Sequence, residues 1–161
     1  MQTCIVPVVS FNYAARNIER CRKTLSASMA FGMALMSIGT LCFEFIPGEL
    51  LSVFSQDQLV IDIGINAFRI IGISFIPLVS SLTFPVFFQA VGSSFKSSML
   101  TVVRTVLLFV PLAFLFSRFG LQYFWLTFPV TDSLTSLVGL LLYRKSVSYT
   151  HLRAHETSAH L

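Results

Sequence analysis

The chain consists of long apolar segments joined by short polar connections. A helix needs about 20 mostly apolar residues, at 1.5 Å each, to cross the hydrocarbon core of a membrane. Four segments meet this length: residues 24–46, 64–91, 99–117 and 120–143. The pattern predicts an all-α fold, a polytopic membrane helix bundle with four transmembrane helices.

Composition and charge placement support a membrane protein. The chain has 161 residues, of which 55% are hydrophobic and 11% charged, whereas soluble domains are roughly 45–50% apolar and about 25% charged. The net charge of +4 comes from Lys and Arg clusters between apolar segments, as in loops that face an anionic membrane surface. We therefore expect a lipid bilayer around the chain and no nucleic-acid partner.

The basic clusters also predict the orientation, because Lys and Arg are retained on the cytoplasmic side of a membrane. They lie at three places that fall on one side of the bundle: residues 16–23, Lys96 and residues 144–145. On the other side, residues 47–63 contain acids and no Lys or Arg. We expect residues 1–23 to be the end of a preceding helix and a cytoplasmic loop, and both ends of the native chain to be cytoplasmic in the cell (inner or plasma) membrane.

The last residues have a different character. All three histidines lie within the final eleven residues, and VSYTHLRAHET, from residue 147, resembles one reading frame of a transposase-type sequencing-library adapter. We interpret residues 147–161 as a sequencing-adapter artefact and exclude them from functional reasoning. Without them the chain has no histidine. The three cysteines have no metal-ligand spacing, so we expect no metal site, no cofactor and no enzyme activity.

Asp132 is the acid nearest the middle of a predicted span, about twelve residues from either end of the segment 120–143. A carboxylate at this depth is costly unless it faces a cavity, a cation or a partner, so it predicts a functional site for cation binding or proton exchange. Thr131, Ser133 and Thr135 would lie in the same polar seam. The alternative is a protonated Asp132 that hydrogen-bonds between helices.

Other polar residues within the spans have more ordinary interpretations. Arg69 and Arg104 lie about six residues inside a span, so their side chains can reach the interface by snorkelling. An ion pair with Asp132 would bridge a displacement of about 9 to 10 Å along the membrane normal. Asn66, Gln89 and Ser80 could bind substrate, although hydrogen bonding across helices is the simpler role.

Prolines occur inside three successive spans: Pro77, Pro85, Pro111 and Pro129. Proline in a helix frees a backbone carbonyl, which in a membrane must be satisfied by neighbouring protein or by water in a cavity. We expect these prolines to kink their helices. Such helices are typical of a transporter rather than of simple membrane anchors.

Several motifs resemble one transporter family. PVVSFNYAARNIERCRK (residues 7–23), FFQAVG (residues 87–92), Arg104 and FPVTD (residues 128–132) resemble, in order, sequences in the C-terminal half of the multidrug and toxic compound extrusion (MATE) family. The loop motif departs mildly, with Phe11 for the usual Tyr and Ala14 for the usual Gly. The resemblance covers residues 1 to about 145.

The resemblance implies a twelve-helix transporter with two six-helix halves, of which this chain would form the last four helices. It implies efflux of organic cations or amphipathic drugs in antiport with Na⁺ or H⁺, and the remaining helices of the transporter as partners. The family's usual coupling acid on the tenth helix has no counterpart, since residues 64–91 contain no Asp or Glu. The candidates for cation coupling or the substrate cavity are Asp132, Thr131, Gln89 and Asn66.

Two further classes of function remain alternatives. One is a flippase for a lipid-linked oligosaccharide from the same wider superfamily, although such a protein needs more cavity-facing cations to hold an anionic substrate. The other is a four-helix membrane anchor or assembly protein without transport activity. An intramembrane enzyme is disfavoured, because the native segment offers no histidine and no paired carboxylates.

Overall fold

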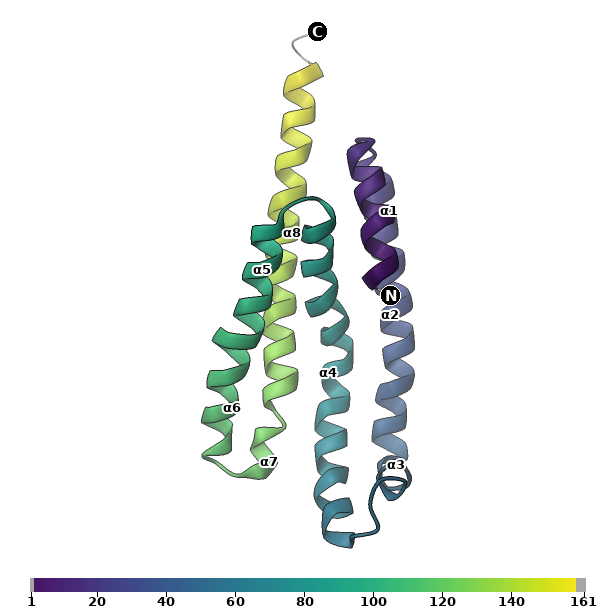
Figure 1. The fold of residues 1–161 in the computed structure, drawn as a ribbon, viewed down its shortest axis with the longest axis vertical. Coiled ribbons are helices and arrows are strands. Elements are labelled where there is room, and N and C mark those ends of the chain that lie inside the picture. Colours follow the sequence, from purple (N-terminus) through teal and green to yellow (C-terminus); the bar gives the residue numbers. More distant parts are fainter. Residues whose placement is uncertain (1, 159–161) are drawn as a thin grey trace.

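The computed structural model describes the backbone of residues 2–158 and the side chains of residues 5–146. Within that part of the chain the secondary structure is helical without strands (Figure 1), which confirms the predicted all-α class. The elements in order are α1 (Gln2–Ala14), α2 (Ile18–Phe45), α3 (Pro47–Ser52), α4 (Gln58–Ala90), α5 (Ser94–Val102), the π-helix η1 (Val103–Phe109), α6 (Val110–Ser117), α7 (Leu121–Phe124) and α8 (Thr127–Ser158).

Four stretches are long and apolar enough to cross a membrane, which confirms the predicted number: Ile18–Phe45, Gln58–Ala90, Ser94–Ser117 and Leu121–Ser146. The first two of these stretches begin earlier than predicted, because a polar side chain caps the helix of each. The Asn17 side chain accepts a hydrogen bond from the Arg20 N–H at 3.0 Å, so the basic run forms the first turns of α2 instead of a loop. In the same way, Asp57 caps α4 by accepting from the Leu59 N–H at 2.9 Å.

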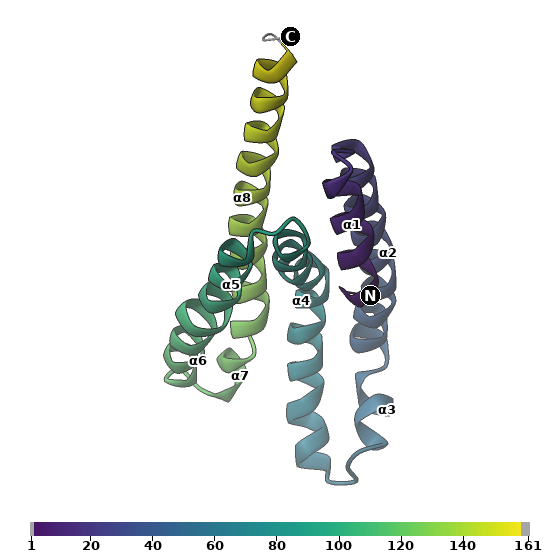
Figure 2. The same ribbon diagram turned by 45° about the horizontal axis from the view of Figure 1, so that its top comes forward.

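The spans run up and down. Figures 1 and 2 show α3 and α7 at one end of the bundle, and the α1–α2 turn, the α4–α5 turn and the C-terminal end of α8 toward the other. The long helix α4 packs against α2 on one side and α8 on the other. The combined helix α5–η1–α6 leans away from α4 toward the α7 end. α4 is therefore the central element of this part of the chain.

The core lies at the end of α4 that precedes α5. Phe84, Phe87 and Phe88 are buried there, and the ring of Tyr143 from α8 stands edge-on to Phe87 with 5.1 Å between ring centroids. Ile5 and Val9 of α1 belong to the same cluster. The Ser10 hydroxyl of α1 also lies 2.9 Å from the Ala90 carbonyl. These contacts hold α1, α4 and α8 together.

Large apolar side chains on the outer faces of α2 and α6 are exposed, among them Phe31, Leu35, Val110 and Phe114. A soluble protein would bury such residues, whereas lipid or further helices can cover them without cost. The chain is thus built as a multi-pass membrane protein.

The prolines occupy three different structural settings. α4 continues through Pro77 and Pro85. Pro111 is the second residue of α6, and only Val110 separates it from the end of η1. Pro129, which we expected to kink a span near mid-depth, lies in the first turn of α8, where the missing N–H has no helical acceptor to lose. The chain breaks the fourth span at Trp125 and Leu126 instead.

The adapter-like residues 147–161 lie outside the residues whose side chains are described. Their interpretation as a sequencing artefact therefore stays a prediction.

Candidate functional site

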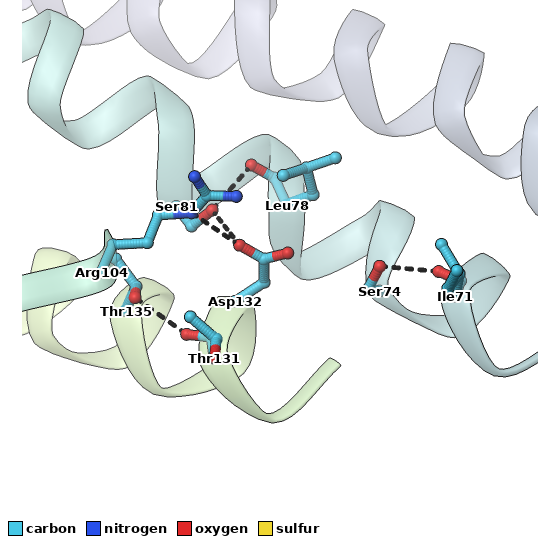
Figure 3. A network of polar contacts seen from close by, with 8 residues as sticks. All are labelled: Ile71, Ser74, Leu78, Ser81, Arg104, Thr131, Asp132 and Thr135. Carbon is cyan, nitrogen blue, oxygen red and sulfur yellow. Dashed lines mark hydrogen bonds and ion pairs between the residues drawn. The ribbon is translucent and has the colours of Figure 1, made fainter. Parts of the chain in front are cut away.

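The polar centre of the bundle is the carboxylate of Asp132 on α8, which is only 2% exposed. Its Oδ1 atom lies 2.9 Å from Nε of Arg104 on η1 and 2.9 Å from the hydroxyl of Ser81 on α4 (Figure 3). Three spans thus meet at one oxygen atom. The other oxygen, Oδ2, has no hydrogen-bond partner among residues 5–146.

The ion pair corrects the expectation that Arg104 reaches the interface by snorkelling. The expected displacement assumed that each residue advances along the membrane normal, but the span that contains Arg104 is inclined and includes a π-helical segment. The flexible side chain covers the remaining separation. The Arg104 side chain is 30% exposed, and its terminal Nη atoms have no bond within the described part of the chain. Arg69, by contrast, is exposed on α4.

Local sequence explains why these groups converge. π-Helical segments inside longer helices are frequent at functional sites. Pro111, which has no N–H to donate to an earlier carbonyl, lies just after this segment in α6. On α4, Pro85 cannot donate to the carbonyl of Ser81, four residues earlier. The Ser81 hydroxyl lies 3.1 Å from the Leu78 carbonyl as well as 2.9 Å from Asp132. Since a hydroxyl has one proton, it can donate to only one of them at a time.

A cavity of about 260 Å³ adjoins the ion pair, lined by Arg104, Thr105, Phe109, Phe128, Thr131 and Asp132. The rings of Phe109 and Phe128 form part of its wall, edge to face, with centroids 5.3 Å apart. Thr131 is 2% exposed, and its hydroxyl oxygen is fully buried without a hydrogen-bond partner among residues 5–146. The cavity therefore combines an aromatic wall with unsatisfied polar groups.

The polar seam that we expected beside Asp132, made of Thr131, Ser133 and Thr135, is only partly formed on α8. Thr135 donates to the Thr131 carbonyl at 2.8 Å and is buried like Thr131, whereas Ser133 is exposed. Sequence reasoning singled out Asp132, Thr131 and Thr135 but missed Ser81. The signal for Ser81 was its position four residues before a proline, where a serine can compensate for a disturbed helix.

The structure does not bring Asn66 and Gln89 to this centre. Asn66 is exposed near the α7 end, beside a second cavity of about 530 Å³ whose lining includes Asp62, Tyr123 and Trp125. Gln89 is exposed at the α4–α5 end, beside a third cavity of about 310 Å³ lined largely by serines and Thr101. The buried residue Ser80, adjacent to Ser81, makes no hydrogen bond to Asp132.

A family model described as MatE matches residues 1–115, more than half of the chain. The chain belongs to the MatE family. No curated protein sequence matches it.

Solved structures show the same fold for this MatE chain. An outward-facing multidrug resistance MATE family transporter of the MOP superfamily has a TM-score of 0.85 at 20% identity, over 93% of this chain and 34% of that one. A MOP superfamily transporter from Pyrococcus furiosus, described as having a binding pocket of reverse polarity, gives 0.86 at 20% identity over the same shares. An inward-facing MATE transporter gives 0.77 at 21% identity, over 93% and 36%. The chain thus spans about a third of the length of these transporters and has the fold of that part.

Proposed function

We propose that this MatE chain forms the last four spans of a twelve-helix transporter that exports organic cations or amphipathic drugs in antiport with Na⁺ or H⁺. The observation that carries the proposal is the buried Asp132 carboxylate, which is shared by three spans and borders a cavity. An acid in this setting is suited to bind and release a cation. On this proposal both native ends are cytoplasmic in the cell membrane.

The Arg104 pair supplies a mechanism for the exchange. Arg104 neutralises Asp132 while no other cation is bound, which offsets the cost of a buried carboxylate. An incoming Na⁺ or H⁺ competes with the guanidinium for the carboxylate. Because Asp132, Arg104 and Ser81 belong to α8, η1 and α4, the outcome of this competition changes the contact between three spans. Asn66 and Gln89 are proposed as substrate contacts toward the two ends of the path.

The ion pair also weakens the flippase alternative. A site for pyrophosphate or acidic sugars uses clusters of uncompensated cations. Here the Arg104 charge is matched by Asp132, and Arg69 is exposed on a different span. The four-helix anchor alternative offers no use for a cavity with unsatisfied polar groups.

The first experiment is to sequence the source locus across both ends of this reading frame. A frame that extends upstream through about eight more spans, and continues past Lys145 without the adapter-like tail, supports the transporter. A frame that starts at Met1 and stops after four spans would favour the membrane-anchor alternative over the transporter.

The second experiment replaces Asp132 by Asn in the complete transporter. We expect cation-driven efflux of a fluorescent organic cation to slow at least tenfold, with unchanged amounts in the membrane. The matched control is Glu49→Gln, an exposed acid of α3 that lines none of the three cavities described above. Unchanged efflux in the Asp132→Asn variant would leave Asp132 as a hydrogen-bonding group between helices.

A further inference from the structure

The cavity beside Asp132 is electrically balanced. Arg104 and Asp132 contribute one charge of each sign, and their side chains are joined at 2.9 Å. Among the residues that line the cavity, the other four are uncharged: Thr105, Phe109, Phe128 and Thr131. While the ion pair is intact, a bare cation bound beside it adds a positive charge next to the Arg104 guanidinium, and a bare anion adds a negative charge next to the carboxylate. Either one leaves an uncompensated charge in a largely buried place, which is costly.

The unsatisfied groups of the cavity have complementary chemistry. The Nη atoms of Arg104 can donate, and Oδ2 of Asp132 can accept, because neither has a partner among residues 5–146 (Figure 3). The buried Thr131 hydroxyl, which also lacks a partner in the described chain, can do either. Phe109 and Phe128 provide an aromatic wall. A volume of about 260 Å³ lies just below the roughly 300–1,000 Å³ of drug-sized ligand pockets, which suits one ring and a compact head group.

We propose that this cavity binds the zwitterionic head group of a small aromatic compound, in preference to a monocation or a monoanion of the same size. An anionic group of the ligand accepts from the Arg104 Nη atoms, and a cationic group donates to Asp132 Oδ2. The Thr131 hydroxyl gains its missing partner, and the ring of the ligand packs on Phe109 and Phe128. The inference rests on the proposed function in treating the cavity as the substrate site. It narrows the preferred substrates from organic cations and amphipathic drugs in general to those that carry both a cationic and an anionic group beside an aromatic ring.

The test compares three probes that share a phenyl ring and differ in charge: phenylalanine as the free zwitterion, 2-phenylethylamine as the cation and 3-phenylpropanoate as the anion. Their dissociation constants are measured by ligand-observed NMR with the complete transporter in lipid nanodiscs. We expect phenylalanine to bind at least tenfold more tightly than either of the other two. Tightest binding of 2-phenylethylamine would overturn the proposal.

Charge variants should reorder the three probes. Arg104→Gln leaves the carboxylate uncompensated, so 2-phenylethylamine should become the tightest ligand. Asp132→Asn leaves the guanidinium, so 3-phenylpropanoate should become the tightest. The double variant Arg104→Gln with Asp132→Asn contains neither charge and should show no preference above about threefold, which keeps the test informative where a single unpaired charge prevents folding. An unchanged order in these variants means that the probes bind elsewhere and overturns the assignment.

Arg69→Gln serves as the matched control, since it removes a guanidinium that is exposed on α4 and should leave the order of the probes unchanged. Probe binding tests the zwitterion site, and cation-driven efflux tests the antiport proposal. The expected order without cation-driven efflux would refute the antiport proposal alone, whereas efflux of organic cations with tightest binding of 2-phenylethylamine would refute the zwitterion site alone.

Discussion

Gly139 of α8 lies directly against the ring of Phe84 of α4. A Cβ atom at Gly139 would come within 2.5 Å of Phe84 Cδ2 and 2.9 Å of Cγ. Phe84 is buried and makes a further ring contact with Tyr143, at 5.8 Å between centroids. The close approach of α4 and α8, on which the Ser81–Asp132 contact depends, therefore requires glycine at this position.

We expect Gly139→Ala to destabilise the protein by about 1–3 kcal/mol, because the core around Phe84 must shift to accept the methyl group. The measurement is thermal unfolding in detergent or nanodiscs. Gly48→Ala is the control, since its Cβ would meet Ile65 Cδ1 at an ordinary 3.8 Å. Equal melting temperatures for the two variants would show that Phe84 can move without cost.

The Thr131 hydroxyl gives a prediction of the opposite sign. Thr131→Val removes a buried polar group that lacks a partner among residues 5–146, so the ligand-free protein should gain about 1 kcal/mol in unfolding free energy. The same change should weaken binding at the cavity. Thr135→Val removes a hydroxyl that donates to the Thr131 carbonyl and should cost about 0.5–1.5 kcal/mol. A loss of similar size in both variants would mean that the Thr131 hydroxyl is satisfied in the complete protein.

The Arg104–Asp132 pair should appear as an interaction energy in a double-mutant cycle. Arg104→Gln, Asp132→Asn and the double variant are compared by chemical unfolding. We expect the double variant to be about 1–3 kcal/mol more stable than the sum of the single effects predicts, because each single change leaves one charge unpaired. Additive effects would show that the pair is fully screened and would remove its proposed part in the exchange.

The turn between α4 and α5 depends on Gly92, which has a φ of 75°. No atom lies within 4 Å of the position of a Cβ there, so the cost of substitution comes from the backbone alone. We expect Gly92→Ala to cost about 1 kcal/mol and Gly92→Asn clearly less, since Asn tolerates left-handed geometry better. The measurement is the thermal unfolding of the two variants. An equal loss of stability in both would contradict the explanation that the cost comes from the backbone conformation.

The helices could be predicted from sequence because apolar length alone identifies a span, and Asp132 could be singled out by its depth. The pairing with Arg104 could not be derived from residue counts, since these assume straight, upright helices, and the π-helical segment and the inclination of the third span change where the side chain lies. Residue counts also do not show which face of a helix a polar residue occupies. Asn66, Gln89 and Ser81 are all polar residues of the second span, but only Ser81 faces α8, and no periodic pattern in this apolar segment distinguishes it.

The π-helical segment η1 has a consequence for movement. η1 is closed by i→i+5 bonds instead of the i→i+4 bonds of an α-helix, so we expect that a return to α-helical geometry would keep the span continuous. Shifting one residue through the helix would turn Arg104 by about 100° relative to α6 and withdraw its guanidinium from Asp132. A local change between π-helical and α-helical geometry in the third span would then form or break the ion pair with α8, without a movement of whole helices.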